Sequence, residues 1–210
     1  MKFFNLLFQY FFNSRKRKDA YSESHIVGRY ASSYWLNLII AGTEKAQFLE
    51  SATEIVFRKS LFLGSATEKL IFRVSTPFRL YFHPEVDLQV YHYKRRYLGD
   101  YAVKNELLMY KGKFCAAIYF LDTSINFTDI KEALKLKYVV NGGSLNTFEN
   151  ICFTDINNNQ LFFLKTEFST LLVYTIRGFF ESLAQDLDEK MTLKNKLLEQ
   201  KILLDIMRDI

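Results

Sequence analysis

Proline, cysteine and histidine are scarce in this sequence. Its 210 residues include only 2 Pro, 2 Cys and 3 His. Two cysteines cannot build a framework of several disulfides, and Cys115 and Cys152 lie among apolar neighbours in segments that we expect to be strands. We therefore expect buried thiols and a reducing, cytoplasmic environment, with one buried disulfide as the alternative.

Sequence signatures of enzymes are also missing. The chain has no glycine-rich phosphate-binding loop, no Gly-x-Ser-x-Gly motif and no Cys-x-x-Cys pair. Four residues with metal-binding side chains fall close together: His83, Glu85, Asp87 and His92. Their spacing fits no ligand pattern and is more typical of a solvated turn. We expect no cofactor, no metal and no enzymatic activity, and the sequence offers no residue on which a catalytic site could be based.

Apolar and aromatic residues are abundant instead. With 49% hydrophobic residues, 21 Phe and 13 Tyr, the chain is not largely disordered and can bury one substantial core. The net charge of +5 permits an anionic partner without requiring one. We expect an α+β protein with N-terminal helices, a mainly antiparallel central sheet of about six to eight short strands, and a long C-terminal helix. The expected divisions are an apolar and basic segment over 1–18, the α+β core over 19–167, and the helix over 168–210.

Turn signals and residue types place the elements of the core. Strands are expected at 70–74, 78–82 and 88–93, with one hairpin pairing 106–110 and 113–121 around Lys111 and Gly112, and a second pairing 148–153 and 161–165. A short helix is expected from Asp129 to about Lys137, capped by Thr128. Residues 34–40 form a buried element of either type. Residues 43 to about 60 are expected to be helical, because Phe48, Ala52, Ile55 and Phe62 recur on one face.

The C-terminal stretch carries the clearest periodic pattern. Apolar side chains recur every three or four residues in a line that is interrupted at Asn195: Phe180, Leu183, Leu187, Met191, Leu198, Ile202 and Ile206. A second line is expected to run beside the distal half of the first and to widen the apolar face: Leu193, Leu197, Leu204 and Met207. No Gly or Pro follows Phe179, so the run can form a helix of about 45 Å.

Such a helix is longer than a small domain needs, so its distal part is expected to be available for a protein partner or for a second copy, in a short coiled coil. The expected contact residues are Leu197, Leu198, Ile202, Leu204, Ile206 and Met207. The start of the helix is ambiguous, because Leu171 to Ile176 also suits a strand, and Gly178 fits either a turn or a close-packing point in a helix. We expect helix from about Phe168.

The N-terminal segment is apolar over residues 3–12, apart from Asn5 and Gln9, and basic immediately afterwards. Ten residues are too few to span a bilayer, which takes about 20, and most of the charge follows the apolar run rather than preceding it as in a signal peptide. The favoured interpretation is a first helix docked on the core or on a partner. The alternative is an in-plane anchor on an anionic membrane surface through Phe4, Phe8, Phe11, Arg15, Lys16, Arg17 and Lys18.

One cluster mixes aromatic and basic residues: Tyr91, Tyr93, Lys94, Arg95, Arg96 and Tyr97. Strand alternation places Tyr91 and Tyr93 on one face of the sheet, where aromatic rings beside cations could bind single-stranded nucleic acid. Tyrosines in a strand that ends in a charged turn are also common without such a role. We therefore expect, in this order, a non-enzymatic interaction or assembly component, a nucleic-acid-binding module, and a peripheral membrane protein.

If the N-terminal segment is a membrane anchor, the chain should bind anionic vesicles weakly. Each of the four cations from Arg15 to Lys18 contributes about 1 kcal/mol near an anionic surface. Co-sedimentation with phosphatidylserine-containing vesicles should then pellet more of the full chain than of a chain lacking residues 1–18. Equal pelleting of the two would exclude the anchor.

Overall fold

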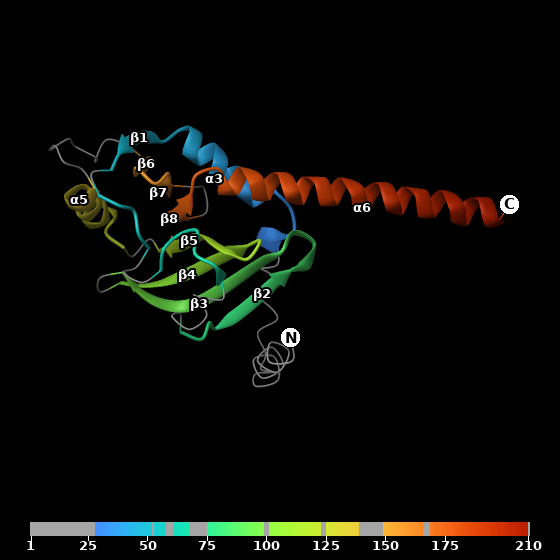
Figure 1. Ribbon diagram of the computed structural model, residues 1–210, viewed down its shortest axis with the longest axis horizontal. Coiled ribbons are helices and arrows are strands. Elements are labelled where there is room, and N and C mark those ends of the chain that lie inside the picture. The colour runs from blue at the N-terminus through green and yellow to red at the C-terminus, as the bar shows by residue number, and fades with distance from the viewer. Residues whose placement is uncertain are drawn as a thin grey trace.

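The computed structural model describes residues 28–51, 53–57, 61–67, 75–98, 101–122, 125–138, 149–165 and 169–209. The strand expected at 70–74 lies outside these ranges. The described chain is α+β, as predicted, with a long helix at its C-terminal end (Figure 1). Its elements are α3 (Tyr34–Glu44), β1 (Gln47–Glu50), β2 (Arg79–His83), the 3-10 helix η1 (Pro84–Val86), β3 (Leu88–Leu98), β4 (Tyr101–Tyr110), β5 (Lys113–Leu121), α5 (Phe127–Tyr138), β6 (Ile151–Thr154), β7 (Asn159–Lys165), β8 (Thr170–Ile176) and α6 (Phe179–Asp209).

The strands form one eight-stranded sheet in the order β1-β6-β7-β8-β5-β4-β3-β2. Every neighbouring pair is antiparallel except β1 and β6. The predicted hairpin of β4 and β5 is confirmed, and its turn residues Lys111 and Gly112 have φ angles of 48° and 73°, as a tight two-residue hairpin turn requires. The predicted pairing of β6 with β7 is confirmed as well.

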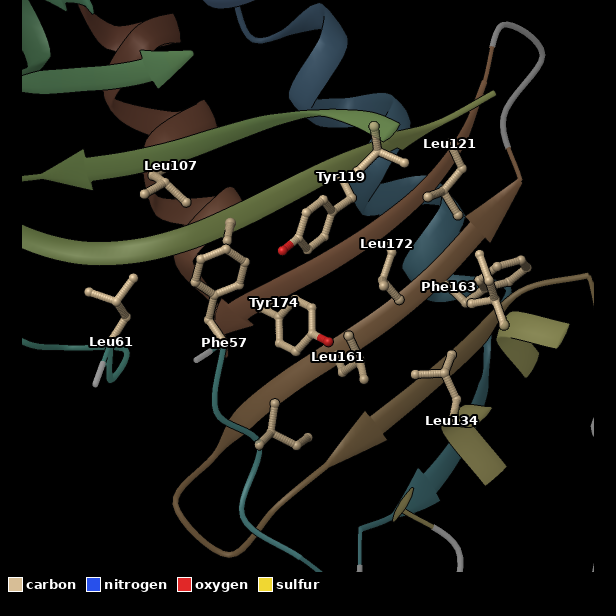
Figure 2. Packing of buried hydrophobic residues seen from close by; sticks show 14 of the residues in the cluster. Phe57, Leu61, Leu107, Tyr119, Leu121, Leu134, Leu161, Phe163, Leu172 and Tyr174 are labelled. Atoms are coloured by element: carbon tan, nitrogen blue, oxygen red, sulfur yellow. The ribbon is translucent and has the colours of Figure 1, made fainter. Parts of the chain in front are cut away.

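Both faces of the sheet are covered. On one face, α3 and the first turns of α6 bury Leu36, Ile39 and Leu183 against the sheet. On the other face, α5 packs together with the irregular segments 53–57 and 61–67 (Figure 1). Figure 2 shows this second layer, in which the Phe57 ring lies beside two tyrosines of the sheet. Its ring centre is 5.6 Å from that of Tyr119 and 5.5 Å from that of Tyr174.

The helix predicted from residue 43 to about residue 60 is wrong. Helix α3 covers 34–44 and is followed by β1, which pairs in parallel with β6. Beyond β1, the backbone N–H of Ile55 donates to the Asp155 carboxylate at 2.7 Å. Asp155 is buried at the turn between β6 and β7 and also accepts the N–H groups of Asn157 and Asn159. The contact between Ile55 and Asp155 joins residues 100 apart in the sequence, and it holds this segment in an irregular conformation although its apolar spacing is helical.

The start predicted for the C-terminal helix at Phe168 is also wrong. Residues 170–176 form β8, and the helix begins at Phe179. Strand β8 lies between β5 and β7 and is buried on both faces, so its apolar run is continuous and carries no strand alternation. Gly178, at φ 76°, makes the turn into the helix and accepts the N–H of Ser182 at 3.1 Å.

The short helix predicted near Asp129 is confirmed as α5, with a different cap. The side chain of Asn126, rather than that of Thr128, accepts a backbone N–H of the first turn, that of Thr128, at 3.1 Å. Ile130 and Leu134 face the core, whereas Ala133 is exposed.

A buried carboxylate fastens the segment before α3 to the sheet. Glu106 on β4 is fully buried and bonds to the Arg29 guanidinium. It also accepts the Tyr30 hydroxyl at 2.9 Å and contacts Nδ1 of His92 on β3 at 3.2 Å. Burial, with the charge of Glu106 beside it, raises the pKa of Tyr30 well above its ordinary value. The Arg29 guanidinium also lies 4.8 Å from the centre of the Phe120 ring, so residues 29–30 are held by charge, hydrogen bonding and aromatic contact together.

Replacing Glu106 should therefore destabilise the fold strongly. Glu106→Ala leaves Arg29, Tyr30 and His92 without their shared acceptor, and removing one partner of a buried ionic pair costs about 3 kcal/mol or more. Urea unfolding of the purified chain measures the loss. Glu106→Gln keeps the shape and one acceptor oxygen and should lose less. A loss below about 1 kcal/mol in the alanine variant would contradict a shared anchor of this kind.

Candidate functional site: the projecting C-terminal helix

Only the first turns of α6 belong to the body of the protein. Phe179, Phe180, Leu183, Ala184 and Leu187 are buried against the sheet. From Asp188 to Leu204 every side chain is exposed, and the helix extends away from the sheet without touching it (Figure 1). At 1.5 Å per residue, the projecting part from Asp188 to Asp209 is about 33 Å long. The helix therefore has a packed proximal part and an exposed distal part, and the availability of the distal part for a partner stays a prediction.

Large apolar side chains cover much of the projecting part. Their exposed fractions run from 43% at Met191 to 74% at Met207. The set is Met191, Leu193, Leu197, Leu198, Ile202, Leu203, Leu204, Ile206 and Met207. It includes the six residues predicted to contact a partner, and the structure brings all six onto the same stretch of helix. An apolar surface of this kind, standing clear of the body, is typical of a site where another chain binds.

The arrangement of these side chains differs from the expectation of one wide face. Residues in a regular helix advance by about 100° each, so Leu193 lies more than half a turn from Met191. Leu193, Leu197, Leu204 and Met207, which we call the second stripe, therefore lie on the opposite side of α6 from Met191, Leu198, Ile202 and Ile206, the first stripe. The expectation that the second line runs beside the first was wrong. The first stripe continues the side of the helix on which Phe180 and Leu187 are buried against the body.

Cations separate the two stripes along one side of the helix. Lys190, Lys194, Lys201 and Arg208 all project there, and all are exposed. Arg208 lies 3.6 Å from the Asp205 carboxylate, one turn away. The projecting part therefore presents two apolar surfaces with a basic border between them, which suits a helix with a neighbour on each of two sides.

Polar contacts fix the root of the helix. The Asp186 carboxylate accepts the Tyr110 hydroxyl and lies 2.6 Å from Nζ of Lys111 in the turn between β4 and β5. The hydrogen bond from Lys111 lowers the pKa of Asp186. Two residues further on, the Ser33 hydroxyl donates to Asp188, the residue at which the helix leaves the body. These contacts set the direction in which the projecting part points.

The aromatic and basic cluster is divided between the core and the surface. Tyr91 and Tyr93 share one face of β3, as predicted, but both side chains are buried in the core cluster on that face of the sheet. Lys94 and Arg95 are exposed, and the Arg96 guanidinium lies 4.0 Å from the centre of the Tyr93 ring. Rings that stack on bases must be accessible, so these two tyrosines serve the core. Binding of nucleic acid by the cations stays a prediction, and the side chain of Tyr97 lies outside the described residues.

The predicted membrane contacts, Phe4, Phe8, Phe11 and Arg15 to Lys18, also lie outside the described residues. Within the described ranges, no helix combines the length and the apolar character that crossing a bilayer requires. In the same ranges, no three His, Cys, Asp or Glu side chains gather in a geometry that could hold a metal ion.

The cysteines are buried and neither forms a disulfide, as predicted. Burial raises the pKa of Cys115 to about 11 and that of Cys152 to about 12. Both thiols therefore stay protonated and unreactive near neutral pH.

The cluster around Glu106 was not predicted from the sequence. Its signal was present, because His92 and Glu106 face each other in the register of β3 and β4, each the polar exception on its strand's face toward α3 and α6. The carboxylate is fully buried beneath Arg29 and Tyr30, so we interpret the cluster as structural.

The contacts of Asp186 generate a pH-dependent prediction. Because folding lowers the pKa of Asp186, its stabilising contribution is present above the unfolded value of about 3.9 and is lost as pH falls through the folded value. Asp186→Asn should lower the free energy of unfolding by up to about 1 kcal/mol at neutral pH, since the carboxylate is partly exposed. Thermal unfolding should show that difference shrinking as pH falls below the unfolded value of about 3.9. Asp205→Asn, the same change on the projecting part, should have no effect on the body at either pH.

Comparison with known proteins finds no match to this chain among family models, curated proteins or solved structures. We therefore infer its function from the geometry of the chain alone.

Proposed function

We propose that this protein is a non-enzymatic assembly component that binds helices of a partner, or of further copies of itself, through the projecting part of α6. The observation that carries this proposal is the exposure of apolar side chains on a helix that stands clear of its own body. The body already buries both faces of its sheet and does not need these residues for its core.

Energetics support an occupant for this surface. Helix stability in proteins comes mainly from packing an apolar face, and isolated helices of moderate length are marginal in water. Completing the burial of a half-exposed Leu, Ile or Met side chain would contribute on the order of 1 kcal/mol. With nine such side chains, the sum is large enough to support a stable complex after the cost of association is subtracted.

The two opposed stripes favour a neighbour on each side of the helix. A two-stranded coiled coil would cover only one stripe and leave the other in water. A bundle in which α6 lies between two other helices covers both. The first stripe advances by slightly more than 3.5 residues per turn, so the contact should be short and nearly straight rather than an extended supercoil.

Each stripe should be required separately for assembly. Leu198→Asp with Ile202→Asp places two charges in the first stripe, and Leu197→Asp with Leu204→Asp places two in the second. Both variants should keep the thermal stability of the body, because these side chains are more than half exposed. Both should lower the mass measured by light scattering to that of a monomer or a smaller species.

The matched control is Lys194→Gln with Lys201→Gln. It changes the net charge by the same two units on the basic border between the stripes, and it should leave assembly intact. A wild-type chain that remains monomeric at high concentration and captures no partner would contradict the proposal. Loss of assembly in the first-stripe variant alone would contradict the two-sided arrangement and would indicate a pair of helices in contact through the first stripe.

A further inference from the structure

A groove of about 640 Å³ runs between α3 and the root of α6. Its apolar lining includes Ile40 on α3 and Ala184 and Leu193 on α6. Its rim carries three carboxylates, from Glu181, Asp188 and Glu189, against one lysine, Lys196. The groove opens on the side of α6 that faces away from the basic border, between the two stripes. An elongated segment that is apolar on one side and basic at one end would match this lining.

The chain contains a segment of that chemistry outside the described residues. Phe4, Phe8 and Phe11 recur at helical spacing within an otherwise apolar run, and four consecutive cations, Arg15 to Lys18, follow it. The apolar run matches the apolar lining of the groove, and the cations match the three carboxylates on its rim. The basic border on the opposite side of α6 would repel the same segment.

The described chain begins close to the groove. Ser33, five residues after Gly28, donates its hydroxyl hydrogen to Asp188 on the groove's rim. The Glu106 cluster holds Arg29 and Tyr30 in place, so the point at which residues 1–27 join the body is fixed. Residues 19–27 can span about 30 Å when extended, which is enough to bring Lys18 back to the rim.

The geometry points to a docking site for this chain's own N-terminal segment: residues 3–18 lie in the groove between α3 and α6, with Phe4, Phe8 and Phe11 on its apolar lining and Arg15 to Lys18 at Glu181, Asp188 and Glu189. In this docked position, the apolar residues of the segment are not available to contact a membrane or another protein. This inference does not require the assembly proposal, because the groove lies at the root of α6 and shares only Leu193 with the second stripe.

Disulfide trapping in the full chain tests the docking. Ser14→Cys places a thiol beside the four cations without removing any of them, and Thr192→Cys places one in the groove. The native thiols do not compete, because both are buried and have raised pKa values. Under mild oxidation, we expect this pair to form an intrachain disulfide at least about fivefold faster than Ser14→Cys with Lys194→Cys, the matched control on the opposite side of the same helix.

A charge exchange tests the recognition itself. Glu181→Lys with Glu189→Lys should slow trapping to Thr192→Cys about fivefold, and adding Arg15→Glu with Lys16→Glu should restore it. These positions on α6 are exposed, so circular dichroism should show an unchanged fold. Equal trapping at positions 192 and 194, or trapping that ignores the charge exchange, would overturn the docking. Disulfide-linked dimers in place of intrachain products would assign the groove to a second copy and would overturn it equally.

Discussion

Burial of the first turns of α6 against the sheet is the contact on which the rest of the helix depends. Phe179, Phe180, Leu183 and Leu187 enter the core, and each buried side chain of this size contributes about 1.5–3 kcal/mol. Beyond Leu187, the side chains of α6 are no longer buried against the sheet. The stability of this buried contact therefore determines whether the exposed part of α6 points in a defined direction relative to the body.

The sheet explains why the root is strong. Strands β5 and β8 at its centre are buried on both faces, so they need a layer above and a layer below. Helix α3 and the start of α6 supply one layer, and α5 with the irregular segments supplies the other. Residues up to about 190 supply both of these layers. The last turns of α6 therefore cover neither face of the sheet.

Local signals predicted the parts of this fold that local interactions determine. The β4–β5 hairpin follows from its Lys111–Gly112 turn, and the long helix from a helical apolar period without Gly or Pro. Strand β8 was ambiguous because a strand buried on both faces has no alternation to detect. The irregular conformation of the backbone around Ile55 could not be predicted from neighbouring residues, because it is fixed by a hydrogen bond to Asp155, 100 residues away. The positions of the two stripes on opposite sides of α6 could have been predicted from the sequence, because they follow from the angular step of a helix. The groove could not have been predicted in this way, because it lies between α3 and α6, which are far apart in the sequence.

The projecting part of α6 also acts as a lever. A rotation of about 6° at the root would displace the tip of an arm of about 33 Å by roughly 3 Å, close to the spacing between two successive residues of a strand. Whatever binds near Ile206 therefore experiences small changes at the contacts of Asp186 and Asp188 as large displacements. Conversely, a partner that holds the tip exerts leverage on those contacts, so their stiffness sets how precisely two bodies joined by this helix can be positioned relative to each other.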